Sequence, residues 1–462
     1  MAAAIVTAAG CGLRVDHRTV LAEYQAGPAE TTTVAPPGAA GPGVQPSAGV
    51  TAAPDTTAAP GSTPTIATVP GAPTASTIGP NVGPKGSASA GSHSTRPSSA
   101  VATSTTPASG APIVIGTTGS YSGVSNIGIG PRDTLYVWAK WVNSQGGIAG
   151  HPVQVVAEDN ASDDNRALAD VQDLVGNHHA VAITMAPGAD IASFLPYLQQ
   201  KQVPVAGGFA ESERWWQSPI AFPSGSAASA VGFDSAIAQG AHKKIIAVLY
   251  CAESAVCKEN GDKAAAYAPK LGLTVKYEAS VSIATPDFTA SCIQAQSRGV
   301  EALIVFADAA TVTRLANNCD NQGYHPTYAA LGDDTLAAQP SLQGMVSASD
   351  TFAWTDTSTP ATAAYQQAMD AYGPKVPRNA AGADAWAGAE EIRKALEGAA
   401  GPVTGQTVLA GLWKMRNETL GGLVPGMTFV KGANATPNYC TQPMIVQNKK
   451  WTAQGPRVCT PP

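Results

Sequence analysis

A reversal of the chain within residues 141–159 most constrains how this protein can fold. Trp138 and Trp141 recur at helical spacing, and a pair of glycines follows them that can end a helix in a left-handed cap. The short apolar run at 152–157 then reads as a strand, and a similar run at 112–116 precedes the helix. The pattern therefore predicts strand, loop, helix, strand, which is the beginning of an α/β sheet.

The same alternation continues along the chain and then starts again. Residues 112–206 hold three strand–helix units with short loops, which predicts a parallel sheet with right-handed crossovers. A second series runs through 242–331, helices are expected at 359–416, and strand pattern returns near 440–451. Two such series predict two Rossmann-like lobes with parallel central sheets. A ligand of these sheets is expected beyond the carboxyl ends of their strands.

Residues 12–111 are expected to form a disordered tether. From about 27 to 110 the sequence is almost entirely Ala, Pro, Thr, Gly and Ser, without Leu, Phe, Tyr or Trp. Such a segment cannot bury enough apolar surface to offset the loss of chain entropy on folding. Residues 12–26 carry more charge and apolar character and have no clear assignment. A tether of this kind suits the crossing of a cell-wall layer, and a spacer without that purpose fits the same residues.

The first eleven residues resemble a shortened bacterial lipoprotein signal. Ala8-Ala9-Gly10-Cys11 matches the cleavage motif, in which Cys11 would be the lipidated residue. The basic region that normally opens such a signal is missing, and a wrongly assigned start codon would explain this. The alternative is a segment without function that contains one stray cysteine.

Six further cysteines predict disulfide bonds. Their number is even, they form no Cys-x-x-Cys pair, and no histidine lies at metal-ligand spacing, which favours disulfides over zinc. Six cysteines allow 15 connectivities. Proximity in sequence favours the pairs Cys251–Cys257, Cys292–Cys319 and Cys440–Cys459.

Composition and motifs exclude several classes of function. The formal net charge of −6 gives no support to nucleic-acid binding, and no apolar run reaches the ~18 residues of a membrane span. The Gly128-Ile-Gly130 pair lacks the third glycine of a dinucleotide site, and no hydrolase, Walker or zinc-protease motif is present. The adjacent His178 and His179 are read as a surface pair at a helix end. We therefore expect neither an enzyme nor a cofactor or metal.

With both series in place, the sequence resembles type I periplasmic binding proteins, specifically the branched-chain amino-acid (leucine/isoleucine/valine) binding proteins of ABC transporters. Among these it resembles the lipoproteins of actinobacterial type. The resemblance runs in order from about 112 to 451 and rests on these motifs: Asn143-Ser-Gln-Gly-Gly-Ile-Ala-Gly150, Val-Val-Ala-Glu-Asp159, Gln202-Val-Pro-Val-Ala206, Asp287-Phe-Thr-Ala, Arg298-Gly-Val-Glu-Ala-Leu-Ile-Val and Asn321-Gln-Gly-Tyr324.

The family fold implies that the chain crosses a hinge three times. Lobe one would then comprise 112–238 and 352–436, and lobe two 239–351 and 437–462.

The resemblance also implies a ligand site between the lobes. The ligand carboxylate would meet backbone donors after two strands of lobe one, where the family's serine is replaced by Gly188, and Asp333 would hold the ligand ammonium. Each of these residues can equally serve as a turn or helix-cap residue. The full expected site is Ser120, Tyr121, Ser122, Ala186, Gly188, Ala189, Gly208, Phe209, Ala210, Glu211, Tyr250, Asp308 and Asp333.

The implied function is that of an extracytoplasmic receptor. It would bind a small solute, such as a branched-chain or other amino acid or an amide-like analogue, and deliver it to an ABC permease. Its contact with the membrane would be through the lipid anchor alone. A sensory or cell-wall-associated binding lipoprotein that feeds no transporter is the alternative, and an α/β enzyme is a remote one.

Overall fold

A computed structural model describes residues 108–460 except 124–125, 186, 189, 208–209 and 211. The described residues all belong to one compact unit. The expected signal segment with Cys11 and most of the tether lie outside the described residues. So do five residues of the expected site, namely Ala186, Ala189, Gly208, Phe209 and Glu211.

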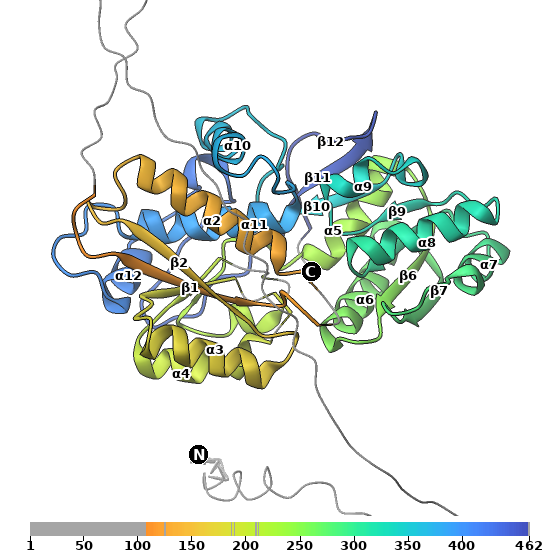
Figure 1. Ribbon diagram of the computed structural model, residues 1–462. Coiled ribbons are helices and arrows are strands. Elements are labelled where there is room, and N and C mark those ends of the chain that lie inside the picture. The colour runs from red at the N-terminus through yellow and green to blue at the C-terminus, as the bar shows by residue number, and fades with distance from the viewer. Residues whose placement is uncertain are drawn as a thin grey trace, which may run out of the picture. The chain divides into compact units, whose positions relative to one another are not determined.

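The first lobe is built on a five-stranded parallel sheet in the order β2-β1-β3-β4-β5. Figure 1 shows α3 and α4 on one face of this sheet and α2, α11 and α12 on the other. The strands are β1 Ile113–Gly119, β2 Val153–Asp159, β3 Ala182–Thr184, β4 Val205–Ala206 and β5 Ala221–Phe222. The helices are α2 Ile129–Ser144, α3 Asp164–Gly176, α4 Leu195–Lys201, α10 Pro360–Tyr372, α11 Ala380–Ala395 and α12 Gly405–Leu412.

The predicted helix–turn–strand between α2 and β2 is confirmed. Gly146 and Gly147 both have positive φ, which ends α2. The side chain of Asn143 then accepts a hydrogen bond from Val153 N at 2.7 Å and donates one to Val153 O at 2.8 Å. One amide side chain thus joins the end of the helix to the beginning of the strand.

The second lobe is built on a mixed sheet in the order β12-β11-β10-β9-β8-β6-β7, and β13 pairs with β11. Strands β6 to β10 pair in parallel, whereas β11 joins β10 and β12 antiparallel. The parallel strands are β6 Ile245–Cys251, β7 Thr274–Val281, β8 Ala302–Phe306, β9 Thr327–Ala329 and β10 Val346–Ser349. The C-terminal strands are β11 Cys440–Gln447, β12 Lys450–Ala453 and β13 Val458–Cys459.

Helices cover both faces of the second sheet because its central strands are apolar on both sides. In β6, Ile246 and Val248 pack into one core cluster, while Ala247 and Leu249 pack into the other. The helices are α5 Ser229–Ser235, α6 Ala255–Tyr267, α7 Thr289–Ser297, α8 Ala309–Asn321 and α9 Asp334–Ala337. Short 3-10 or π turns lie at η1 Ile191–Ser193, η2 Glu213–Trp216, η3 Ala236–Ala241, η4 Ala268–Leu271, η5 Pro340–Leu342 and η6 Leu420–Gly422.

One expected lobe boundary differs from the structure. The boundary after residue 238 would place α5 in lobe one, but α5 contacts α6, β10 and β11 of the second sheet. Phe233, Ala236 and Ile237 belong to the same core cluster as the strands of lobe two. The chain therefore leaves lobe one between β5 and α5. The apolar pattern of this helix did not reveal which of two similar sheets it covers.

The structure contains the three predicted disulfides, each within lobe two. Cys251–Cys257 joins the end of β6 to the first turns of α6, and Cys292–Cys319 joins α7 to α8. Cys440–Cys459 joins β11 to β13. No helix within the described part of the chain is long and apolar enough to cross a membrane.

A contact between two glycines brings α11 close to the end of β4. A Cβ added to Gly388 would lie 2.8 Å from the Cα of Gly207 and 2.9 Å from Thr184 Oγ1. We expect Gly388→Ala to lower the free energy of unfolding, because overpacking costs about 1–3 kcal/mol and outweighs a gain of about 1 kcal/mol in helix propensity.

Gly176→Ala is the matched control. Gly176 ends α3, and a Cβ there would have nothing within 4 Å. Urea unfolding should show this variant as stable as the parent or slightly more so. A Gly388→Ala protein of parental stability would contradict the close approach of helix and strand.

Candidate functional site

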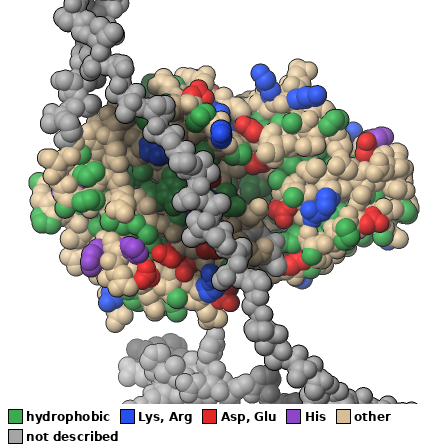
Figure 2. Space-filling view, in the orientation of Figure 1, with side chains coloured by type: hydrophobic (Ala, Val, Ile, Leu, Met, Phe, Trp, Pro, Cys, Tyr) green, Lys and Arg blue, Asp and Glu red, His purple; other side chains and the backbone are tan. Residues whose placement is uncertain are grey.

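A cavity of about 430 Å³ lies between the two lobes. It is formed where the parallel strands of both sheets end: Gly188 follows β3, Cys251 ends β6, Ala307 follows β8 and Leu331 follows β9. Figure 2 shows the face of the molecule hollowed between the lobes, with hydrophobic side chains inside the hollow. The carboxyl ends of parallel strands are the usual ligand position in such sheets. This cavity is therefore the candidate site.

The first loop of lobe one is held by the protein's own carboxylate. Asp159, at the end of β2, accepts hydrogen bonds from the N–H groups of Tyr121 at 2.9 Å and Ser122 at 3.2 Å. It also accepts a hydrogen bond from the Ser122 hydroxyl. Although burial opposes it, these hydrogen bonds lower the pKa of Asp159 below its usual value. The N–H groups of Tyr121 and Ser122 are thus already used within the chain.

Ser120 connects this loop to its neighbour after β3. Its hydroxyl lies 3.1 Å from Asn160 Oδ1 and 2.6 Å from Ser162 Oγ, and its N–H donates to Pro187 O at 3.0 Å. Gly188 has a φ of +87°, and a Cβ there would lie 2.2 Å from Ser120 Oγ. Glycine at 188 is therefore required by the close approach of the two loops.

A chain of charged groups leads from lobe one across to lobe two. Asp164 accepts a hydrogen bond from Asp190 N at 2.8 Å, and the Asp190 carboxylate pairs with Arg214 Nε at 3.0 Å. Arg214 also approaches Glu259 of α6 at 4.0 Å, and Glu259 pairs with Lys263 at 2.9 Å. Of these five residues, the first four line the cavity. Arg214 therefore connects acidic residues of the two lobes across the cavity.

Lobe two contributes carboxylates and aromatic rings to the cavity. Glu253 accepts hydrogen bonds from Ser282 Oγ at 2.6 Å and Ile283 N at 3.1 Å; although burial opposes it, these bonds lower the pKa of Glu253. Asp308 caps α8 by accepting from Thr311 N at 2.7 Å. The rings of Phe233 and Phe306 lie 5.5 Å apart, centroid to centroid. Polar and aromatic groups thus converge on one cavity.

The cavity includes only some of the residues expected from the sequence. Among the described residues, Gly188 and Asp308 line it. Six other expected residues do not line it, namely Ser120, Tyr121, Ser122, Ala210, Tyr250 and Asp333. Asp159 and Asn160 hold the first loop, which contains Ser120, Tyr121 and Ser122. Ala210 is buried, and its carbonyl oxygen accepts a hydrogen bond from Trp216 Nε1 at 2.7 Å. The Tyr250 ring packs against Gly261 of α6.

Asp333 differs most from its expected role. It is the N-cap of α9, and its carboxylate accepts hydrogen bonds from Thr335 N at 2.8 Å and Asn379 Nδ2 at 2.9 Å. Asn379 is the N-cap of α11 and Trp451 Nε1 donates to the Asp333 carbonyl at 2.8 Å. Asp333 therefore connects α9 to α11 and β12 and does not line the cavity, and its role as the ammonium ligand stays a prediction.

Sequence reasoning did not identify several charged residues of the cavity. Arg214 lies in η2, after β4, and Glu253 is the second residue after the end of β6. Glu259 lies in the second turn of α6, and Asp164 begins α3. Inspection of every charged residue within about ten positions after a strand would have found them. Trp215, which follows Arg214 in η2, also lines the cavity.

Two buried carboxyl groups lie around α5, whose Ser229, Ala230 and Phe233 line the cavity. Asp234 is fully buried, and neither of its carboxyl oxygens has a hydrogen-bond partner. Burial raises its pKa to about 8. Asp350 accepts the Ser229 hydroxyl at 2.7 Å, and burial raises its pKa to about 7.

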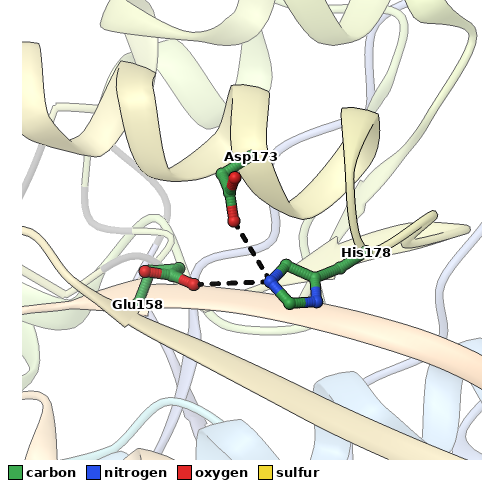
Figure 3. A group of neighbouring side chains, drawn as sticks. All are labelled: Glu158, Asp173 and His178. Carbon is green, nitrogen blue, oxygen red and sulfur yellow. Dashed lines mark ion pairs between the residues drawn. The ribbon is translucent and has the colours of Figure 1, made fainter.

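A second group of ionisable residues lies on the outside of lobe one (Figure 3). His178 Nε2, just after α3, is 3.1 Å from Asp173 Oδ2 and 4.0 Å from Glu158 Oε1. These are residue types that bind metal ions, and burial together with the neighbouring Asp170 and Asp173 raises the pKa of Glu158. The three side chains form ion pairs at the edge strand of the sheet. They do not contribute to the cavity between the lobes.

Another hollow of about 630 Å³ lies beside β12 and is more open to solvent. It is lined by Asp334, Asp356, Lys450 and Trp451 among others. The indole of Trp451 packs against that of Trp354 with centroids 5.4 Å apart. This hollow lies between β12, α9 and the segment before α10, and it shares no lining residue with the cavity between the lobes.

Residues 112–450 match a family model described as periplasmic binding protein. The structure resembles a branched-chain amino acid ABC transporter protein from Thermus thermophilus with bound valine (TM-score 0.63, 17% identity, 76% of this chain and 97% of that chain covered). It also resembles a fatty acid ABC transporter substrate-binding protein from Thermomonospora curvata (TM-score 0.64, 18% identity, 77% of this chain and 94% of that chain covered). A third similar structure is an ABC transporter solute-binding protein from R. palustris in complex with benzoate (TM-score 0.62, 15% identity, 75% of this chain and 98% of that chain covered). A search of curated proteins finds no match.

The buried acid in α5 generates a prediction about pH. Because the pKa of Asp234 is about 8 in the folded protein and near 4 when unfolded, the folded state retains a proton that the unfolded state has released between these values. This residue therefore lowers stability progressively as pH rises from about 4 to 8. Asp234→Asn should remove that loss, so its melting temperature relative to the parent should rise by roughly 2–8 °C between pH 5 and pH 8.

Asp262→Asn provides the control, because Asp262 is exposed and pairs with Lys258 at 2.7 Å. Its melting temperature relative to the parent should hardly change over the same pH range. A pH-independent offset for Asp234→Asn would show that Asp234 titrates normally in the folded protein.

Proposed function

Because this chain belongs to the periplasmic binding protein family, we propose that it is an extracytoplasmic receptor that captures a small organic solute for an ABC importer. The observation that supports the proposal most directly is the cavity of about 430 Å³ enclosed by both lobes. Proteins with such a cavity bind by hinge closure, in which the ligand favours the closed state through contacts with both lobes. The cavity volume suits a solute of amino-acid size or somewhat larger.

The three solved structures differ in what they carry. Their descriptions name valine, a fatty acid and benzoate, and all are at most 18% identical to this chain. Family membership therefore supports capture of a small solute. The chemical class of that solute has to be inferred from the residues that line this cavity.

Titration calorimetry and thermal shift against a panel of amino acids, amides, amines and small acids test the proposal. We expect one-to-one binding, and we expect Ala255→Trp to weaken it at least about tenfold, or 1.4 kcal/mol. Ala255 is exposed, begins α6 and lines the cavity, so an indole there would obstruct closure without disturbing the core.

Ala290→Trp is the matched control, because Ala290 is an exposed residue in the first turn of α7 and does not line the cavity. It should bind as the parent does. Equal loss of affinity in both variants, or none in either, would contradict a site between the lobes.

We further propose that Cys11 carries a lipid and that residues 12–111 tether the binding domain to the membrane. The match of Ala8-Ala9-Gly10-Cys11 to a lipoprotein cleavage motif supports this. In cells that produce the full chain from its native start, the protein should incorporate a labelled fatty acid and partition into detergent. Cys11→Ser should abolish both. An unlabelled parent protein would contradict the anchor.

A further inference from the structure

The charged groups that line the cavity are mostly carboxylates. Among the described residues, five acidic side chains face a single guanidinium, and no lysine or histidine lines the cavity. These groups are Asp164, Asp190, Glu253, Glu259, Asp308 and Arg214. A cleft lined by one sign of charge concentrates its field on the ligand position. The electrostatic potential there should therefore favour a positively charged solute.

The one positive group is already paired. The Asp190 carboxylate lies 3.0 Å from Arg214 Nε, and the Glu259 carboxylate lies 4.0 Å from Arg214 Nη1. A carboxylate ligand would have to compete with both residues for the guanidinium. Removing Arg214 from Asp190 would also leave that carboxylate in the cavity without its ion pair.

Several backbone donors around the cavity are also occupied by the protein's own acids. Asp159 accepts two N–H groups of the first loop, Asp190 caps η1, and Asp308 caps α8. The starts of α5 and α6 differ, since neither has a side-chain cap. The start of α6 is, however, preceded directly by Glu253, which lines the cavity. An anionic group at the start of α6 would therefore lie beside a carboxylate.

Aromatic rings in the cavity suit an organic cation. Trp215, Phe233 and Phe306 line it, and the electron-rich face of an aromatic ring attracts an ammonium group. Asn260 also lines the cavity and has a buried side-chain oxygen without a hydrogen-bond partner. An ammonium N–H is a donor that could satisfy such an oxygen.

From the carboxylates, the paired guanidinium and the rings together, we propose that the cleft selects an organic cation, an amine or quaternary ammonium compound without a carboxylate. This inference rests on the proposed capture of a small solute in the same cleft. The carboxylates supply the long-range attraction and the aromatic rings the contact surface.

The first test compares four probes by titration calorimetry on the full chain: putrescine, choline, leucine and benzoate. We expect at least one of the two cations to bind more tightly than leucine, benzoate to bind most weakly, and cation affinity to fall as salt is raised. Tighter binding of leucine or benzoate than of both cations would overturn the cation assignment while leaving solute capture intact. A folded protein that binds nothing in this or the wider panel would contradict solute capture itself.

Charge variants test the cause. Asp164→Asn and Asp308→Asn keep the hydrogen-bond acceptors that hold Asp190 N and cap α8. Combined, they should weaken binding of the preferred cation roughly 2- to 30-fold. Arg214→Gln should act in the opposite direction and strengthen it, a gain that misfolding would not produce.

The control pair is Asp262→Asn with Asp320→Asn, two exposed acids outside the cavity that pair with Lys258 and His325. It alters net charge equally and should leave affinity within about twofold. An equal loss in the control pair would show that total charge, and not the cavity, sets the affinity. Abolished binding in Arg214→Gln, together with benzoate binding by the parent, would identify Arg214 as an anion clamp and overturn the proposal.

Discussion

The carboxylate of Asp159 determines what the first loop of the cleft can do. By accepting the N–H groups of Tyr121 and Ser122, it fixes the loop in place and leaves Ser120 directed at Asn160 and Ser162. That arrangement leaves no room for a side chain at residue 188. The loop thus becomes part of the scaffold, and the contact with a solute passes to other residues. The acids at the ends of the neighbouring strands follow the same pattern, since Asp190 and Asp308 each cap a helix start.

Much of the fold could be predicted because it depends on local patterns. The apolar runs of β1, β6 and β8, the glycines after α2 and the even number of cysteines each identify a feature without knowledge of the rest of the chain. The position of α5 could not be predicted in this way. Its small apolar residues would suit either sheet, and only the contact with β10 and β11 decides between them.

The site was harder to predict because it depends on how loops from distant segments meet. The resemblance predicts a site between the lobes, and Gly188 and Asp308 of that prediction line the cavity. Asp333 does not line it, because a carboxylate after a strand can turn toward the cavity or cap the next helix, and here Asn379 and Thr335 hold it in the second role. Arg214 and Glu259 come from different lobes, so no local pattern relates one to the other.

These observations lead to one account of the molecule: two lobes enclose a cavity whose acids and rings select a positively charged solute. A crystal structure of the protein with its tightest-binding solute tests that account most directly. The account predicts the solute between the lobes, with its cationic group near Trp215, Phe233 or Phe306 and the cavity carboxylates. A solute bound in the hollow beside Trp451, or one whose carboxylate contacts Arg214, would contradict it.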